Sequence, residues 1–452
     1  MNIPLKMNRD FEKAMTTLNE RYGEDFEYLN GFHETQLNFS DFIDGFIDKN
    51  VADVTIDANA NASNKDIRSL LNEKGKSHDK LFAFNKIFYE MKKRYNLKTA
   101  REWLETEYNG GFYLHDASTS TYLPYCYAYD LTRLAVLEYL TSGVTSIFDM
   151  YLTPDTIAEA CLDTGMRCVL VSGLNNFSSS PKQVEEEFLK WNKKNSLISY
   201  QLGFHAEYTC SKELLWKVSE MAHHYRTPVY AHISETEKEV EECKARYGMT
   251  PPMFLDSLGM FDYGGGGFHC VHVTDQDLDV FRRHRMYVIT NPGSNTKLAS
   301  GIAPIADYVR HKIPVAIGTD GPASNNCLDM FREMFLVTGL SKLLEKDAAS
   351  MDAMEVLKMA TVNGAKAMRL NRADVLAKGK YADLIMIDLH QPNMQPIHNI
   401  PKNLVYSGSK SNVCMTMIGG KILYRNGEFN VGEDPERIYA KCEKIVKRLL
   451  TE

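Results

Sequence analysis

From about residue 135 onward, short apolar and β-branched runs alternate with amphipathic stretches of helical period. The short runs predict strands, and the stretches between them, such as 211–225 and 303–312, predict helices. Regular strand-helix alternation implies a parallel sheet, and about this many units predicts a TIM-type (β/α)8 barrel. We recognise seven strands rather than eight, at 145–150, 167–174, 198–206, 228–234, 267–273, 286–292 and 314–320.

The two ends of the chain follow other patterns. After the barrel come helices at 328–343 and 350–369, and then alternating strands with a turn at Gly419–Gly420. The first part of the chain is mainly helical in pattern and does not continue the alternation. We therefore predict an α/β chain in three parts, namely a mainly helical N-terminal segment (1–131), an incomplete barrel (132–375), and a small partial β-sandwich with a terminal helix (376–452).

Composition excludes several classes of protein. The chain is 44% hydrophobic and 25% charged, as is usual for a soluble globular protein. It has no apolar run near the ~18 residues of a membrane span, and its net charge of −7 gives no reason to expect a nucleic-acid partner. The nine cysteines are an odd number and form no C-x-x-C pair. Such usage favours a reducing cytoplasm and argues against a disulfide framework or a cysteine-based zinc site.

Candidate chemistry lies where predicted strands end. His205, His232, His269 and Asp320 stand at four such ends, and the strand ends of a barrel meet at one face. Imidazole and carboxylate groups suit a divalent metal, which lowers the pKa of a bound water, and Glu235 is a candidate proton donor. Each residue also has a structural alternative: a hydrogen-bonded core histidine, or a turn aspartate before Gly-Pro. The four together, in order, favour a metal-dependent hydrolase.

The motifs around these residues resemble the amidohydrolase superfamily, in particular its adenosine-type, cytosine-type and guanine-type deaminases and the related chlorohydrolases. The resemblance covers residues 132–452 and is strongest to 5-methylthioadenosine/S-adenosylhomocysteine deaminases. The motifs that carry it are LTSGVTSIFDMY, FHAEYTCS, AHISET, FHCVH, NPGSNTKLASGIAPI, GTDGPASNN, MATVNGAKAM, KYADLIMIDL and NLVYSG.

The resemblance implies a role for each candidate residue. His232 and Asp320 are the expected ligands of one divalent metal, zinc or alternatively iron. His269 is grouped with them in the metal site, where it orients the bound water. Glu235 moves a proton to a purine ring, His205 and Glu235 contact the substrate, and Asp320 is also the base for the water. The expected catalytic residues are therefore Glu235, His269 and Asp320.

Two departures from the family pattern change this expectation. The family's first barrel strand ends in a His-x-His pair that supplies two ligands, and none of the thirteen histidines here has another two positions away. We therefore predict that the barrel lacks its first strand, and that the metal is weakly bound or absent because catalytic zinc sites use about three protein ligands. Relatives that bind S-adenosylhomocysteine also place an arginine where Ser172 stands, so a carboxylate-bearing substrate loses its partner.

Residues 20–134 resemble a different family, the anaerobic (class III) ribonucleoside-triphosphate reductases. The matching text includes VADVTIDANANASNKDIRSLL, HDKLFAFNKIFYEMKKRY and YLPYCYAYDLTRLA, and Cys126 matches a cysteine near that family's active site. A buried thiol is an equally good interpretation of Cys126. The chain has no glycyl-radical motif and no C-terminal cysteine quartet, so we expect no reductase activity.

Three hypotheses follow for the whole chain. The first is a metal-dependent deaminase of a small purine nucleoside-like substrate, impaired by the missing strand. The second is a catalytically inactive, chimeric fusion or remnant. The third is a binding module related to ribonucleotide reductase. For each we expect a cytoplasmic protein, with no nucleic-acid or membrane partner, that forms homo-oligomers or self-associates through unpaired strand edges.

Overall fold

A computed structural model describes residues 4–5, 37–38, 113–116, 121–193 and 195–451. The chain divides into two compact units, Met1–Ala128 and Tyr129–Glu452. In the first unit, the described strands form two antiparallel pairs, β1 (Pro4–Leu5) with β2 (Leu37–Asn38) and β3 (Tyr113–Asp116) with β4 (Thr121–Pro124). Most of the predicted helical segment, and most of the reductase-like text, lies outside the described residues. So does the side chain of Cys126.

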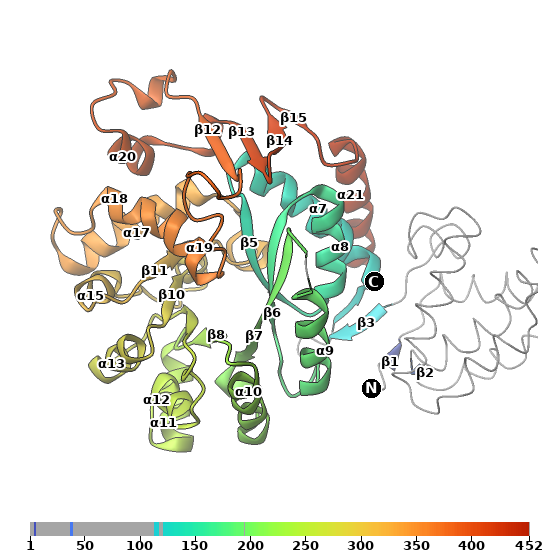
Figure 1. The fold of residues 1–452 in the computed structure, drawn as a ribbon, viewed down its shortest axis with the longest axis vertical. Helices are drawn as coiled ribbons and strands as arrows, with labels where there is room; N and C mark the ends of the chain where they lie inside the picture. Colours follow the sequence, from blue (N-terminus) through green and yellow to red (C-terminus); the bar gives the residue numbers. More distant parts are fainter. Residues whose placement is uncertain (1–3, 6–36, 39–112, 117–120, 194, 452) are drawn as a thin grey trace, which may run out of the picture. The chain divides into compact units, whose positions relative to one another are not determined.

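The second unit is built on one parallel sheet with helices packed around it (Figure 1). Its strand order is β11-β10-β9-β8-β7-β6-β5, so each strand pairs with its neighbours in the sequence, as the alternating pattern predicts. The seven strands are β5 (Ser146–Tyr151), β6 (Arg167–Ser172), β7 (Ile198–Ala206), β8 (Val229–Ile233), β9 (Gly265–His269), β10 (Tyr287–Thr290) and β11 (Val315–Ile317).

The sheet is strongly curled. Phe148 on β5 and Phe268 on β9 have ring centroids 5.5 Å apart, although three strands lie between them in the sheet. In a flat sheet, four strand spacings would separate these residues by about 19 Å. The two rings therefore meet across the inside of a curved sheet, which is the arrangement of a partial barrel with a TIM-like fold.

The two edge strands come close to each other without pairing. Among the described strands, β5 pairs only with β6 and β11 only with β10. Tyr139 bridges these edges: it hydrogen-bonds with the side chain of Thr319, which follows β11, and lies near the carboxylate of Asp149 on β5. Burial raises the pKa of both Tyr139 and Asp149, the latter to about 6. The sheet thus has an open seam whose sides are linked by a side chain.

Helices cover the outside of the sheet and connect its strands. The first of them, α7, begins in the text that the sequence assigns to the N-terminal segment and leads into β5. The described helices are α7 (Tyr125–Thr141), α8 (Pro154–Thr164), α9 (Pro181–Trp191), α10 (Lys212–Tyr225), α11 (Glu237–Tyr247), α12 (Pro251–Ser257), α13 (Asp275–Arg283), α14 (Pro292–Lys297), α15 (Ile305–Arg310), α16 (Pro322–Asn325), α17 (Met330–Glu345), α18 (Ala353–Lys358), α19 (Gly364–Ala367), α20 (Ile400–Lys402) and α21 (Pro435–Thr451).

Local sequence fixes where several of these helices begin. Ser211 and Thr274 precede α10 and α13, and their hydroxyls accept hydrogen bonds from the backbone N–H groups of Leu214 and Asp277. These bonds satisfy N–H groups that have no partner inside the helix, which is worth about 1 kcal/mol per cap. Gly165 ends α8 in the left-handed conformation, with φ of 83°. The chain can therefore turn sharply from a helix into the next strand.

The helix predicted over 350–369 is interrupted. It consists of α18, a five-residue π segment at Met359–Asn363, and α19. The wider turn places Asn363 so that its side-chain amide donates to the carbonyl of Val315, at 2.7 Å. Because neighbouring carbonyls on a strand point to opposite sides, this carbonyl lies on the edge of β11 that does not pair with β10. The π segment thus satisfies part of an open strand edge.

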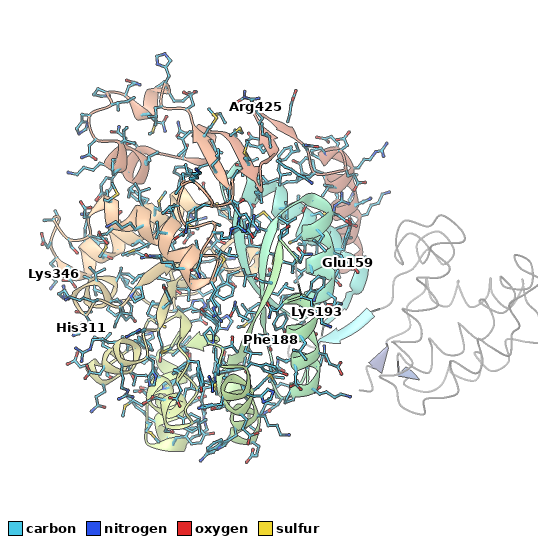
Figure 2. The ribbon with its side chains drawn as sticks, viewed as in Figure 1. Glu159, Phe188, Lys193, His311, Lys346 and Arg425 are labelled. Atoms are coloured by element: carbon cyan, nitrogen blue, oxygen red, sulfur yellow. The ribbon has the colours of Figure 1, made fainter. Side chains whose placement is uncertain are left out.

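Two hydrophobic layers hold the unit together, one outside and one inside the sheet. Alternate residues of each strand, such as Leu170 and Leu202, pack against the helices. The residues between them fill the inside of the curl, where Val171, Tyr230 and Ile289 meet. Side chains fill these layers, and Lys346 and His311 lie at the periphery (Figure 2).

The C-terminal strands form a separate small sheet. It is antiparallel and four-stranded, composed of β12 (Leu384–Ile387), β13 (Val413–Ile418), β14 (Lys421–Arg425) and β15 (Glu428–Phe429). In the described part of the chain, this sheet stands where the sequence predicts a small partial β-sandwich. A buried, bidentate ion pair joins it to the barrel: Arg167 on β6 donates from Nε to Asp383 Oδ2 at 2.5 Å and from Nη2 to Oδ1 at 2.9 Å.

No helix in the described ranges is both long enough and apolar enough to cross a membrane.

Candidate active site

The structure brings the predicted site residues together at one end of the barrel. His205, His232 and His269 belong to the C-terminal ends of β7, β8 and β9, and Asp320 follows β11. The rings of His205 and His232 have centroids 4.9 Å apart, and those of His232 and His269 lie 5.4 Å apart. Glu235 is in the loop after β8. This is the face at which barrel enzymes carry their active sites.

His232 is held as a neutral imidazole. Its Nδ1–H donates to the carbonyl of His205 at 2.8 Å, which leaves Nε2 with a free lone pair. Burial lowers the pKa of His232 to about 3, and the neighbouring imidazoles of His269 and His205 add to the effect. A carbonyl acceptor behind Nδ1 is the arrangement that fixes the tautomer of metal-binding histidines. The ring is therefore suited to bind a cation through Nε2.

His269 lies between two carboxylates. It is 1% exposed, and its Nδ1–H donates to the side-chain oxygen of Asn295 at 2.7 Å. Its Nε2 is 3.9 Å from Oε2 of Glu235 and 3.9 Å from Oδ2 of Asp320. Asn295 thus aims the free side of this ring at the space between the two acids. A water or a substrate atom in that space could contact all three groups.

The two carboxylates have partners of their own. Asp320 accepts from the hydroxyl of Ser294 at 2.7 Å and from the N–H of Gly321 at 2.6 Å. Glu235 accepts from the hydroxyl of Ser300 at 3.1 Å. Both side chains remain partly open, at 24% and 20% exposed. They are oriented by the protein and still accessible to a ligand, as proton-transfer groups must be.

His205 and Ser172 have different environments. His205 is half-buried, with Nδ1 3.2 Å from the hydroxyl of Thr209, and the ring of Tyr208 packs edge-on against it. Tyr208 is 51% exposed, so His205 lies beside an open aromatic surface. Ser172 is buried, and its hydroxyl accepts from the N–H of Leu174 at 3.2 Å. It therefore presents no polar group to a ligand.

The donor atoms present match a divalent metal in kind but not in number. His232 and Asp320 offer an imidazole and a carboxylate, which zinc and iron both accept. Within the described residues, however, no group of three or more His, Cys, Asp or Glu side chains is arranged to hold a metal ion. Three protein ligands are usual for a catalytic zinc. The described residues therefore offer fewer suitably arranged ligands than such a zinc site uses.

Sequence reasoning missed the residues that orient the predicted ones. Ser294, Asn295 and Ser300 each hold a different site residue, and all lie in the segment that follows β10. That segment, NPGSNTKLASG, carries the family resemblance, but no role was predicted for its side chains. Their position could have indicated a role, because short polar side chains in a loop after a barrel strand lie at the active-site face.

Comparisons with known proteins agree with this architecture. Residues 88–423 match the Amidohydrolase family, so the match starts upstream of the boundary predicted near residue 131. The chain is 38% identical over 327 residues to a 5-methylthioadenosine/S-adenosylhomocysteine deaminase of Thermoanaerobacter pseudethanolicus, covering 70% of this chain and 75% of that protein. It is also 38% identical to a 5′-deoxyadenosine deaminase of Methanothermobacter thermautotrophicus, covering 69% of this chain and 74% of that protein.

Solved structures give the same result for the fold. An adenosine deaminase from Xanthomonas campestris with bound zinc matches with a TM-score of 0.70 and 30% identity, over 73% of this chain and 77% of that one. A zinc complex of atrazine chlorohydrolase from Arthrobacter aurescens matches with a TM-score of 0.66 and 22% identity, over 71% and 77%, and supports the fold alone. By the extent of the family match and the identity to its relatives, this chain belongs to the amidohydrolase family.

Proposed function

We propose that this chain is a metal-dependent hydrolytic deaminase of an adenosine-type nucleoside. One observation carries the proposal: the carboxylates of Glu235 and Asp320 both lie 3.9 Å from Nε2 of His269, at the C-terminal face of the barrel. Two acids around one oriented imidazole suit a reaction that moves protons at two points. The relatives named as adenosine-type deaminases support the assignment of the ring.

The reaction adds water to the ring carbon that bears the amino group and releases ammonia, leaving a carbonyl in its place. We assign to Asp320 the removal of a proton from the attacking water. Glu235 delivers a proton to the adjacent ring nitrogen, and His269 orients the water through Nε2. His205, beside the exposed ring of Tyr208, contacts the substrate. The arrangement of these groups supports each role by proximity, which is the first requirement for general acid–base catalysis.

Metal affinity is the property that limits the proposed activity. A zinc or iron ion, when bound, lowers the pKa of a water that it holds. His232, through its free Nε2, and Asp320 would be its ligands, with His269 beside them. Because these are fewer than the usual three firm protein ligands, we propose that the ion binds weakly and that turnover is impaired. A chain that retains the fold without activity is the alternative.

The substrate class can be narrowed to nucleosides without a distal carboxylate. Relatives act on methylthioadenosine, S-adenosylhomocysteine or 5′-deoxyadenosine by name. A substrate carboxylate needs a cation, ideally an arginine that pairs with both oxygens. Ser172 stands at the position expected for that arginine, and its side chain is buried. We therefore propose methylthioadenosine or 5′-deoxyadenosine as the substrate, in preference to S-adenosylhomocysteine.

The test combines metal analysis with a deamination assay. Purified full chain is measured for zinc and iron content, then assayed for ammonia release from methylthioadenosine with and without added Zn²⁺. We expect substoichiometric metal and a slow reaction that added Zn²⁺ accelerates. His232→Ala should abolish the acceleration, and His223→Ala, a histidine paired with Asp262 outside the site, should not. An absence of ammonia release at every zinc concentration would overturn the proposal in favour of an inactive remnant.

A further inference from the structure

A buried carboxylate behind the site holds two consecutive backbone N–H groups. Glu239, in the first turn of α11, is 4% exposed. Its Oε1 accepts from the N–H of Ser234 at 2.7 Å, and its Oε2 accepts from the N–H of Glu235 at 2.8 Å. Both oxygens of one ionisable group are therefore committed to the loop that carries the proton donor. Burial raises the pKa of Glu239 to about 7, and its ionised form accepts hydrogen bonds about twice as strong as those to a neutral group.

The same loop also holds the segment that follows His269. The carbonyl of Ser234 accepts from the N–H groups of Val271 at 3.0 Å and His272 at 2.9 Å. This carbonyl and the N–H of Glu235 belong to one peptide unit. A single peptide thus has the Glu239 carboxylate on one side and the loop after β9 on the other. Hydrogen bonds in such a chain polarise and strengthen one another.

Backbone conformation at both loops depends on this support. Ser234 has φ of 51° and Cys270 has φ of 48°, in the left-handed region that residues other than glycine rarely adopt. Neither residue is stable there unless its surroundings fix it. The bonds to Glu239 and to the Ser234 carbonyl restrain these loops, together with the bond from the N–H of Cys270 to the carbonyl of Ile233 at 3.1 Å.

We propose that Glu239 is a positioning residue that fixes both Glu235 and His269 through the Ser234–Glu235 peptide. The inference rests on the proposed function only in that it takes these two residues as the reacting groups. Glu239 itself contacts no reacting atom, because it lies behind the loop. Its removal should disturb two strand ends at once, on β8 and on β9.

If Glu239 only stabilised the start of α11, its removal would affect that helix and leave the loop after β9 unchanged. Glu239 occupies the third position of α11, where a capping-box residue accepts from the N–H of the N-cap residue. Here the carboxylate bonds to the N–H groups of Ser234 and Glu235 upstream as well as interacting with the N–H of Thr236, while the Thr236 hydroxyl caps the helix by accepting from the N–H of Glu239 at 3.2 Å. The capping hydroxyl and the positioning carboxylate belong to different residues, so the two roles can be separated.

Hydrogen–deuterium exchange of the full chain separates them. Glu239→Gln should speed exchange in peptides covering 231–236 and also in those covering 269–273. Thr236→Ala should speed exchange at the start of α11 and leave 269–273 unchanged. Glu242→Gln, an exposed position on the same helix, should match the unmodified chain. If Glu239→Gln does not fold, Glu239→Asp replaces it, because the shorter side chain cannot reach both N–H groups. Faster exchange confined to α11 would overturn the proposal.

Turnover in the presence of Zn²⁺ provides a second test. Glu239→Gln should lower kcat about tenfold or more, the scale of losing a hydrogen bond to a charged group, with little change in KM. In the double variant with Glu235→Gln, the loss caused by Glu239→Gln should be smaller than in the unmodified chain, because only its effect through His269 remains, whereas a purely structural role would add its full loss. A fully additive double variant would count against Glu239. If the unmodified chain shows no turnover, the proposed function fails and the exchange pattern alone decides the role of Glu239.

Discussion

Glu333 gives the clearest prediction on stability. This residue of α17 is fully buried, and its Oε2 accepts from the N–H of Gly293 at 2.7 Å. Its Oε1 accepts from the side-chain amide of Asn325 at 2.8 Å, and the same amide donates to the carbonyl of Thr319, next to Asp320. Burial raises the pKa of Glu333 to about 7, from an ordinary value of 4.5. The change we consider is Glu333→Gln.

The size and sign of the effect follow from proton binding. The folded chain holds the Glu333 proton more tightly than the unfolded chain does, because its pKa is higher in the folded state. The resulting stabilisation is complete below pH 4.5 and is lost as the pH rises through about 7. A tenfold change in proton affinity is worth about 1.4 kcal/mol, so between pH 5 and pH 8 the loss is on the order of 2–3 kcal/mol. Glu333→Gln has no such proton and should lack this part of the pH dependence.

Urea unfolding followed by circular dichroism measures this difference. The free energy of unfolding of the unmodified chain, minus that of Glu333→Gln, should fall by roughly 2–3 kcal/mol from pH 5 to pH 8. Glu355→Gln is the matched control, because Glu355 pairs with Lys358 at the surface, where such pairs contribute little. If the difference is the same at both pH values, Glu333 does not hold its proton as argued, and the reasoning from burial fails.

Four further outcomes are expected. Asp320→Ala should abolish deamination in zinc-supplemented assays, since it removes a ligand and the base together; residual activity would reassign the base. Glu235→Gln should keep the metal but slow kcat by roughly 10²-fold; an unchanged rate would exclude it as the proton carrier. Arg167→Met should lower the free energy of unfolding by about 3–5 kcal/mol, because it leaves Asp383 buried without its partner. Light scattering after gel filtration should show self-association through the edges of β5 and β11 that pair with no other described strand; a stable monomer at high concentration would contradict this.

Much of the barrel could be predicted from the sequence because each strand and helix is indicated by the pattern of its own residues. All seven predicted strands are present, and β7 has the predicted bounds, Ile198–Ala206. Side-chain period and apolar runs determine such elements without long-range information. The same locality limits the prediction: the pattern over 350–369 is helical throughout, and nothing in it shows that Met359–Asn363 widens into a π segment to reach β11.

The grouping of the predicted site residues at one face follows from the sequence, but the network around them does not. His232, His269 and Asp320 stand at strand ends, so topology alone brings them together. Their restraints depend on which loop approaches which: Asn295 reaches His269 across 26 positions, and Glu333 reaches Gly293 across 40. A buried glutamate in a helix has no sequence pattern that separates it from an exposed one. Only the packed structure shows that its carboxylate has N–H groups to accept from.

The weak metal binding that we propose follows from the number of described ligands rather than from a lack of preorganisation. His269 and Asp320 have φ values of 67° and 59°, a conformation that costs about 1–3 kcal/mol for residues other than glycine. Such a conformation persists only when surrounding bonds determine it, and here Asn295 and Ser294 provide them. Both side chains are therefore oriented by other protein groups. An additional ligand would then act on metal affinity directly, and the rate should rise with metal occupancy rather than with any rearrangement of the barrel.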